Sequence, residues 1–153
     1  MIDQYKRHAW QEGGVPSRAY RLRVGKNRTL NAIDLEALGR LLITYLQPSA
    51  LVADVGCGTG IVSEQLLDAG FRPVGLDVSQ QMLVEFSRQP KLKRVPTYEV
   101  DLLKIPPASL KNKFDAAVSR WFLPHYPQWK QVLANLTQLV KPGGYVLVDM
   151  PQR

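Results

Sequence analysis

Short apolar runs alternate with stretches of helical periodicity along most of the chain. Apolar residues recur every three or four positions from Ala32 to Leu46, which predicts one amphipathic helix that ends before Pro48. Strand-like runs follow at 51–55, 73–76, 97–100, 114–119 and 145–149, with helical stretches between most of them at 61–69, 80–88 and 129–139. Parallel neighbours need a crossover connection, so this alternation predicts an α/β fold, a doubly wound, mostly parallel sheet of about five strands.

Composition limits the class of protein. The 153 residues are 45% apolar, 22% charged and 8% aromatic, the balance of one ordinary globular domain. No apolar run is long enough to predict a membrane-spanning helix. Cys57 is the only cysteine, which excludes an internal disulfide and a multi-cysteine zinc site, and we predict no metal site. No apolar leader follows Met1, so the expected location is cytoplasmic.

The net charge of +7 is concentrated near the amino terminus. Residues 1–30 contain seven lysines and arginines but only two acidic residues. Such a segment could attract an acidic small substrate, a phosphate-bearing substrate or RNA, or it could be a solvated basic arm. No aromatic ladder or RNA-binding signature accompanies the charge, so these alternatives stay open.

A glycine-rich turn follows the first predicted strand. The turn is Gly-Cys-Gly-Thr-Gly at 56–60, and a helix is predicted directly after it. Glycines here allow positive φ and let a nucleotide-like ligand lie against the backbone. Ile61 occupies the place of the last glycine in the G-x-G-x-x-G of dinucleotide binders, so an NAD-dependent reductase is the least favoured interpretation. Asp77 ends the second strand, where an acidic residue can accept both ribose hydroxyls of a nucleoside.

These motifs resemble those of class I S-adenosylmethionine-dependent methyltransferases, in the group that includes the ubiquinone and menaquinone biosynthesis enzymes. The matching stretches are Val52–Gly60, Val74–Ser79 followed by Met82, Val100–Leu102 and Leu139–Gly144. They occur in the family's order along residues 52–144. The resemblance implies a Rossmann-like methyltransferase fold, S-adenosylmethionine as cofactor and S-adenosylhomocysteine as product.

The resemblance also implies a set of cofactor-binding residues. The glycine loop with Asp54 would hold the amino-acid end of the cofactor and Asp77 the ribose. Val78 and Met82 would flank the adenine, and Asp101, with Leu102 beside it, would accept from the adenine amino group. Ser119 and Arg120 would lie beside the methionine portion and the transferred methyl. The set is Asp54, Gly56, Cys57, Gly58, Thr59, Gly60, Asp77, Val78, Met82, Asp101, Leu102, Ser119 and Arg120.

Structural roles stay open for several of these residues. Asp77 could cap the following helix, although Ser79 is the better capping candidate. Asp101 could be a turn residue, and Met82 could fill the core. Cys57 is expected to be a small, well-fitting side chain rather than a nucleophile.

Methyl transfer from a sulfonium depends mainly on placing the nucleophile and the methyl in line, so a general base is optional. If a base is used, His125 is the candidate, with a packing or surface histidine as the alternative. The loop after the fourth strand and the amino-terminal segment face the substrate in this family. Tyr5, Trp121 and Phe122 are therefore predicted to contact the substrate.

Two features argue against nucleic-acid bases as acceptors. The fourth strand ends in Ser-Arg-Trp-Phe at 119–122, not in the Asn/Asp-Pro-Pro-aromatic motif of enzymes that methylate base amines. The single cysteine argues against carbon-5 cytosine methylation through a covalent adduct. The predicted function is methyl transfer to a small-molecule acceptor. The alternatives are an RNA methyltransferase and a non-catalytic S-adenosylmethionine-binding module or fragment of a longer enzyme.

The resemblance divides the chain into two parts. Residues 1–47 would form a basic segment and a helix that cover the active site, and residues 48–153 the cofactor-binding domain. The family usually has seven strands, the last two forming an antiparallel hairpin, whereas this chain ends at Arg153, soon after the fifth. We therefore expect either a truncated enzyme or a homo-oligomer that covers the edge strand at 145–149.

Overall fold

The structure is a computed structural model that describes residues 28–123 and 126–149. Its elements are α3 (Arg28–Tyr45), β1 (Leu51–Val55), α4 (Ile61–Asp68), β2 (Arg72–Asp77), α5 (Gln80–Ser87), η1 (Pro90–Leu92), β3 (Thr97–Glu99), η2 (Ala108–Leu110), β4 (Phe114–Ser119), α6 (Trp129–Thr137) and β5 (Val140–Val148). The strands form one sheet in the order β3-β2-β1-β4-β5, and all four neighbouring pairs are parallel. The predicted doubly wound α/β fold is confirmed.

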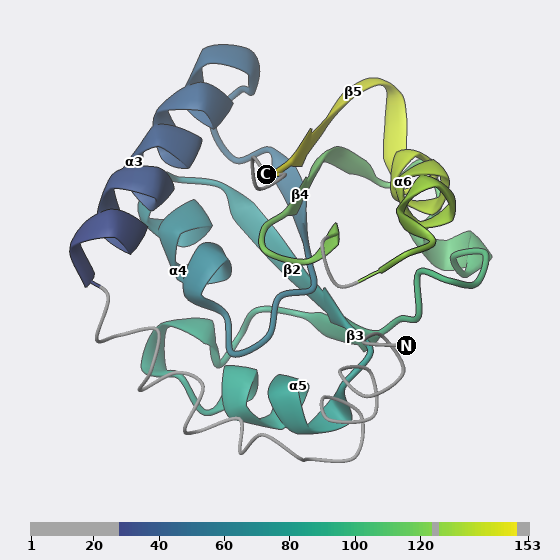
Figure 1. Ribbon diagram of the computed structural model, residues 1–153. Helices are drawn as coiled ribbons and strands as arrows, with labels where there is room; N and C mark the ends of the chain where they lie inside the picture. Colours follow the sequence, from purple (N-terminus) through teal and green to yellow (C-terminus); the bar gives the residue numbers. More distant parts are fainter. Residues whose placement is uncertain (1–27, 124–125, 150–153) are drawn as a thin grey trace.

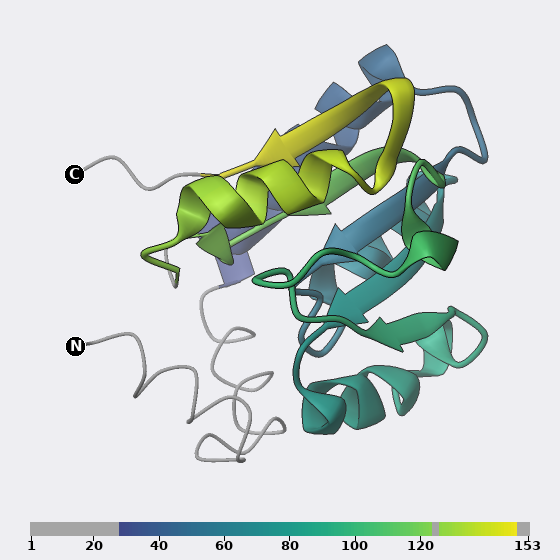
Figure 2. The same ribbon diagram turned by 90° about the vertical axis from the view of Figure 1, so that its right-hand side faces the viewer.

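Helices lie on both faces of the sheet (Figures 1 and 2). One face packs against α3 and α4 through an apolar cluster that includes Leu42, Leu66 and Val52. The other face packs against η2 and α6 through a second cluster that includes Leu110 and Leu136. The strands are apolar on both sides because both of their faces are covered.

The strand order reverses between β1 and β4, since the chain adds β2 and β3 on one side and β4 and β5 on the other. Crevices for ligands in open α/β sheets lie outside the carboxyl ends of the strands at such a reversal. Figure 2 shows the arrowheads of the parallel strands pointing toward one edge. The turn at 56–60 follows β1, so the glycine-rich motif lies at this position in the fold.

Element boundaries differ from the predictions mainly at two places. α3 begins at Arg28, before the predicted start at Ala32. β5 begins at Val140 rather than Tyr145, because Val140 already pairs with Phe114. The next pair is Ala116 with Tyr145, and a register shift lies between the two pairs. The β5 segment at this shift contains the Pro-Gly-Gly sequence, which is typical of a loop.

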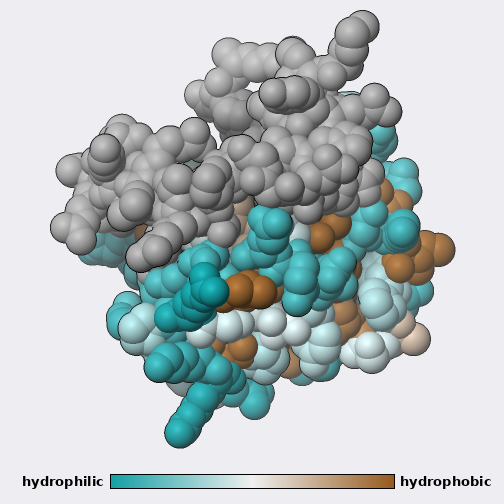
Figure 3. Space-filling view, turned by 90° about the horizontal axis from the view of Figure 1, so that it is seen from below, coloured by the Kyte–Doolittle hydropathy of each residue, from teal (hydrophilic) through white to brown (hydrophobic). Residues whose placement is uncertain are grey.

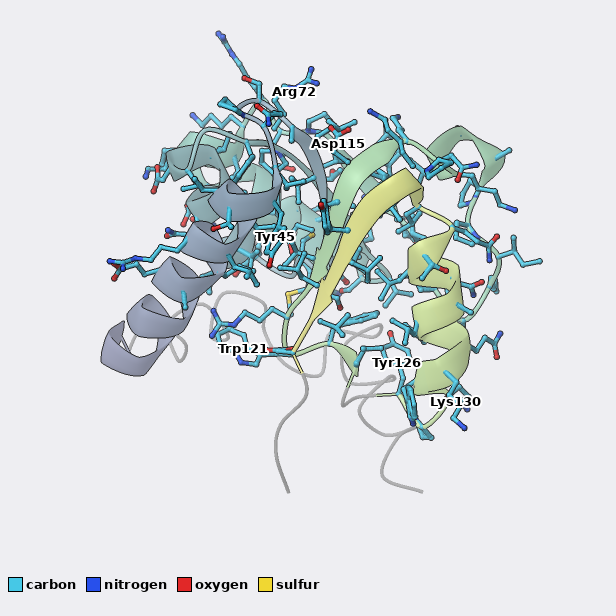
Figure 4. The ribbon with its side chains drawn as sticks, turned by 90° about the horizontal axis from the view of Figure 1, so that it is seen from above. Tyr45, Arg72, Asp115, Trp121, Tyr126 and Lys130 are labelled. Atoms are coloured by element: carbon cyan, nitrogen blue, oxygen red, sulfur yellow. The ribbon has the colours of Figure 1, made fainter. Side chains whose placement is uncertain are left out.

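An aspartate fastens the opposite, amino-terminal edge of the sheet. Asp115 Oδ2 accepts the N–H of Leu51 at 2.7 Å, and its Oδ1 accepts from Lys141 Nζ at 2.7 Å. The Lys141 ammonium, followed by the Leu51 bond, lowers the pKa of Asp115. Figure 4 shows Asp115 and Trp121 at opposite ends of β4. Asp115 therefore joins β1, β4 and β5 at the end remote from the glycine turn.

Among the described residues visible from below, hydrophilic ones lie with hydrophobic ones scattered between them (Figure 3). Within the described part of the chain, no helix is both long and apolar enough to cross a membrane.

Candidate active site

The glycine-rich turn is fixed to the end of β2 as well as to β1. Its three glycines have left-handed backbone, with φ of 71° at Gly56, 52° at Gly58 and 90° at Gly60. The N–H groups of Gly56 and Cys57 both donate to the carbonyl of Leu76, over 2.8 and 3.1 Å. The turn therefore has a defined shape that only residues tolerant of positive φ can adopt.

Two of the glycines leave room for the protein's own side chains. A Cβ on Gly60 would lie 2.1 Å from Cδ1 of Leu92 and 2.8 Å from the ring of Phe86. A Cβ on Gly56 would lie 2.3 Å from the ring of Phe122. The turn is thus packed against the core on one side and covered by an aromatic ring on another. The sequence pattern does not indicate these neighbours, because each lies far along the chain from the glycine that it contacts.

Asp77 bridges the turn and the start of α5. Its Oδ2 accepts the N–H of Gly58 at 2.8 Å, and its Oδ1 accepts the N–H of Ser79 at 2.9 Å. Burial raises the pKa of Asp77, and these backbone bonds oppose that effect. Ser79 is the residue that caps α5, since its Oγ accepts from the N–H of Met82. A carboxylate has about four acceptor positions, so Asp77 can also receive a hydroxyl donor.

The predicted adenine-flanking residues differ in exposure. Val78 is half-buried, whereas Met82 is buried, at 4% exposure. Asp101 accepts the N–H of Leu103 at 3.0 Å, the geometry of a turn-forming aspartate. Leu102 is a core residue whose carbonyl accepts from Asn135 at 2.9 Å. The roles of these residues toward an adenine stay predictions.

Asp54 lies beneath the turn and is 2% exposed. Its Oδ2 accepts from the hydroxyl of Ser63 at 2.6 Å, a partner in α4 that the sequence analysis missed. Burial raises the pKa of Asp54 to about 7, and the nearby Asp77 adds to the rise while the Ser63 bond opposes it. Burial, then the charges of Asp54 and Asp77, raises the pKa of the Cys57 thiol, which favours its expected packing role over that of a nucleophile.

The carboxyl end of β4 supplies the remaining predicted residues. Ser119 is 1% exposed, and its hydroxyl has no hydrogen-bond partner among the described residues. The Arg120 guanidinium stacks over the Trp121 ring, 4.0 Å from its centroid, and its side chain is 7% exposed. Trp121 itself has a left-handed φ of 55°. A groove of about 520 Å³ between α3 and the ends of β4 and β5 is lined in part by Ser119 and Arg120.

Phe122 connects this end of β4 to the glycine turn. Its ring occupies the space beside Gly56 and stacks on Tyr126 with a centroid distance of 4.7 Å. His125 and Tyr5 lie outside the described residues, as does most of the basic amino-terminal segment. The structure thus brings together the glycine turn, Asp54, Asp77 and Phe122.

The comparisons with known proteins identify the family. A family model described as a methyltransferase domain matches residues 53–148, more than half of the chain. The chain belongs to the methyltransferase domain family. The matched segment contains the glycine turn, Asp77 and the ends of β4 and β5.

Curated relatives of this methyltransferase domain have related names. The ubiquinone biosynthesis O-methyltransferase of Proteus mirabilis is 32% identical over 127 residues, which cover 78% of this chain and 51% of the relative. The demethylmenaquinone methyltransferase of Renibacterium salmoninarum is 33% identical over 128 residues, which cover 83% of this chain and 49% of the relative. The chain spans about half the length of these curated relatives.

Solved structures show the same fold. A Methanococcus maripaludis protein assigned as an S-adenosyl-L-methionine-dependent methyltransferase superposes with a TM-score of 0.71 at 20% identity, covering 86% of this chain and 62% of that one. The [4+2]-cyclase SpnF superposes with a TM-score of 0.61 at 28% identity, covering 73% of this chain and 43% of that one. The family and the fold together imply S-adenosylmethionine as the cofactor.

The residues present fit such a cofactor. The Asp77 carboxylate offers acceptors at the switch point of the sheet, and the Ser119 hydroxyl is a buried polar group without a described partner. The turn exposes backbone rather than bulky side chains at Gly58. These are the donor and acceptor types that a nucleoside carrying an amino acid requires.

Proposed function

We propose that the chain acts in S-adenosylmethionine-dependent methyl transfer to a small-molecule acceptor. The observation that carries the proposal is the hydrogen bond between Gly58 and Asp77, which holds a glycine-rich turn and an acceptor carboxylate together where the strand order reverses. Family membership supports the reaction class. The names of the curated relatives, which concern ubiquinone biosynthesis and demethylmenaquinone, support a small molecule over RNA.

The proposed division of labour within the site follows the geometry. S-adenosylmethionine supplies an electrophilic methyl group on a sulfonium. Asp77 would hold the ribose with the acceptor capacity that its backbone bonds leave available. Asp54, beneath the turn, would in its ionised form provide a negative field for the ammonium and sulfonium charges. Ser119 would give its hydroxyl to the amino-acid portion, consistent with its buried and unshared position among the described residues.

The acceptor would approach from the side of the β4 loop. Phe122 lies beside Gly56, so its ring can exclude water from the turn and present an apolar wall to a substrate. In-line displacement depends on orientation, and rigid placement of the reacting groups supplies much of the rate enhancement. His125 remains the candidate base for an acceptor that must lose a proton, and Tyr5 and Trp121 remain candidate substrate contacts.

A transfer assay tests this proposal. The purified chain would be incubated with S-adenosylmethionine labelled in its methyl group and with separate panels of phenols, carboxylic acids, amines and RNA. The expected result is label on a small molecule, lost in the Asp77→Ala variant. Label on RNA alone would replace the small-molecule proposal with the RNA alternative. Tight cofactor binding without transfer to any panel member would favour the non-catalytic module.

The edge strand β5 supports a second, structural part of the proposal. β5 pairs only with β4 within the described sheet, and the neighbouring side chains of Leu41, Tyr45 and Tyr145 are 46%, 54% and 41% exposed. The rings of Tyr45 and Tyr145 contact each other in a tilted arrangement, with centroids 5.3 Å apart. We propose that a second copy of the chain covers this edge, because an exposed apolar strand edge favours pairing.

Sedimentation velocity over a range of concentrations tests the dimer. A dimer that weakens when Tyr145 is replaced by lysine would support it, and a monomer at high concentration would contradict it.

The cytoplasmic location stays a prediction of the sequence, and fractionation of the native cells would test it.

A further inference from the structure

Asp149 ties together the carboxyl ends of β4 and β5. Its Oδ1 accepts the N–H of Trp121 at 2.7 Å, and its own N–H donates to the carbonyl of Ser119 at 3.3 Å. Its Oδ2 lies 3.8 Å from Nε of the largely buried Arg120. The residue is only partly buried, and no sequence motif marked it. It nevertheless contacts three consecutive residues of the segment that leaves β4.

The turn held by Asp149 has an unusual backbone. Trp121 has a φ of 55°, a region that bulky residues rarely adopt because their Cβ crowds the backbone. Such conformations persist where the surrounding contacts determine them. From the described residues, Trp121 receives the Arg120 guanidinium over its ring and donates its N–H to Asp149. Figure 4 shows Trp121 beside the point where β5 ends.

The direction of this turn sets the position of the next residue. Phe122 follows Trp121, and its Cγ and Cδ2 lie 2.8 and 2.3 Å from the place that a Cβ on Gly56 would occupy. If Trp121 relaxed to a negative φ, the chain would leave β4 in another direction and the Phe122 ring would move off the glycine turn. Asp149 is therefore connected to the candidate cofactor loop through Trp121 and Phe122.

We propose that Asp149 is a positioning residue of the active site. It holds Trp121 in the left-handed conformation that places Phe122 against Gly56, and so it shapes the acceptor side of the cofactor loop. This inference rests on the proposed function, because it takes the glycine turn as the cofactor-binding loop. Asp149 contacts neither the methyl donor nor the acceptor and acts through the turn that follows β4.

Asp115 provides a matched comparison within the same pair of strands. It too is a carboxylate that accepts a backbone N–H at 2.7 Å and lies near a cationic side chain. It sits at the other end of β4, away from the glycine turn (Figure 4). Loss of either carboxylate should reduce stability, but only loss of Asp149 should change ligand binding.

The first test compares Asp149→Ala, Asp149→Asn and Asp115→Ala in affinity for S-adenosylhomocysteine, measured by calorimetry, and in unfolding midpoint. Asp149→Ala should weaken binding about tenfold, in line with the loss of a charge-assisted hydrogen bond. Asp149→Asn keeps an oxygen that can accept from Trp121 and should restore affinity to within about twofold. Asp115→Ala should lower the unfolding midpoint but leave affinity within about twofold. Unchanged affinity in Asp149→Ala, or an equal loss in Asp149→Asn, would overturn the proposal.

A second test asks whether Asp149 acts through the Trp121 backbone. Glycine adopts positive φ without strain, so Trp121→Gly removes the need for the clamp. In that background the further change Asp149→Ala should cost less than about twofold in affinity, and this non-additivity is the signature of coupled residues. The same tenfold loss with and without Trp121→Gly would show that Asp149 acts by another route.

Amide hydrogen exchange separates failure of this inference from failure of the proposed function. The Trp121 N–H should exchange slowly in the parent chain and faster in Asp149→Ala, whether or not any ligand binds. Slow exchange that depends on Asp149, in a chain that binds no S-adenosylhomocysteine, would leave the clamp intact and remove the proposed function. Equally tight binding of S-adenosylhomocysteine by the parent chain and by Asp149→Ala would overturn this inference and leave the proposed function intact.

Discussion

The backbone N–H of Gly58 donates a 2.8 Å hydrogen bond to Oδ2 of Asp77, so the glycine-rich turn and the end of β2 are one structural unit. The carboxylate at the candidate ribose position is also an anchor of the turn. A ligand that bonds to Asp77 therefore meets a turn that is already fixed in place. Preorganisation of this kind reduces the entropy that binding costs.

Gly60→Ala should be strongly destabilising. A residue with a side chain at φ 90° carries a strain of about 1–2 kcal/mol, and the added Cβ would lie 2.1 Å from Leu92, which adds about 1–3 kcal/mol of overpacking. Gly70→Ala is the matched control, because Gly70 has a φ of 85° but nothing within 4 Å of the added Cβ. Urea unfolding of both variants measures the difference, and equal losses would contradict the packing argument.

Asp54 should make stability fall as pH rises from about 4 to 7. Its folded pKa of about 7 lies above the ordinary value of 3.8, so the folded state keeps the proton that the unfolded state releases. The contribution is fully present below the unfolded pKa and is lost as pH rises through the folded pKa. Urea unfolding across this range should show Asp54→Asn gaining stability relative to the parent chain, and a pH-independent difference would count against the raised pKa.

Ser63→Ala should destabilise the protein more at pH 8 than at pH 5. At pH 8 Asp54 is ionised and buried, so loss of the 2.6 Å bond from the Ser63 hydroxyl leaves a carboxylate oxygen unsatisfied, at a cost of about 1–3 kcal/mol. At pH 5 Asp54 is largely protonated and the loss should be smaller. Unfolding free energies at the two pH values check this, and a larger loss at pH 5 would exclude the assignment.

Most of the fold could be predicted because apolar periodicity and turn residues are local signals. β1, β4 and the start of α6 were predicted at their observed residues, since apolar runs and punctuation mark their ends. The start of β5 was predicted too late in the sequence. Val140 forms one pair with Phe114, and the bulge that follows this pair has a loop-like sequence. Such a pair depends on where another strand lies, which periodicity does not reveal.

The candidate site was predictable where motifs are contiguous and not where contacts are distant. The turn and Asp77 stand at fixed places relative to strand ends, so their meeting follows from parallel topology. Ser63 could have been inferred as a polar residue on the buried face of the first turn of α4. The role of Asp149 could not be inferred from the sequence. Asp149 and Trp121 are 28 positions apart, and they meet only because the ends of β4 and β5 lie side by side.

The decisive measurement of the cofactor site is calorimetric titration with S-adenosylhomocysteine. It compares the parent chain with Asp77→Ala and uses NAD as the control ligand. We expect micromolar binding of S-adenosylhomocysteine to the parent chain, at least about tenfold weaker binding to a folded Asp77→Ala variant, and no comparable binding of NAD. A folded parent chain that binds neither ligand, or binding that is unchanged in Asp77→Ala, would contradict the assignment of this turn and carboxylate as the cofactor site.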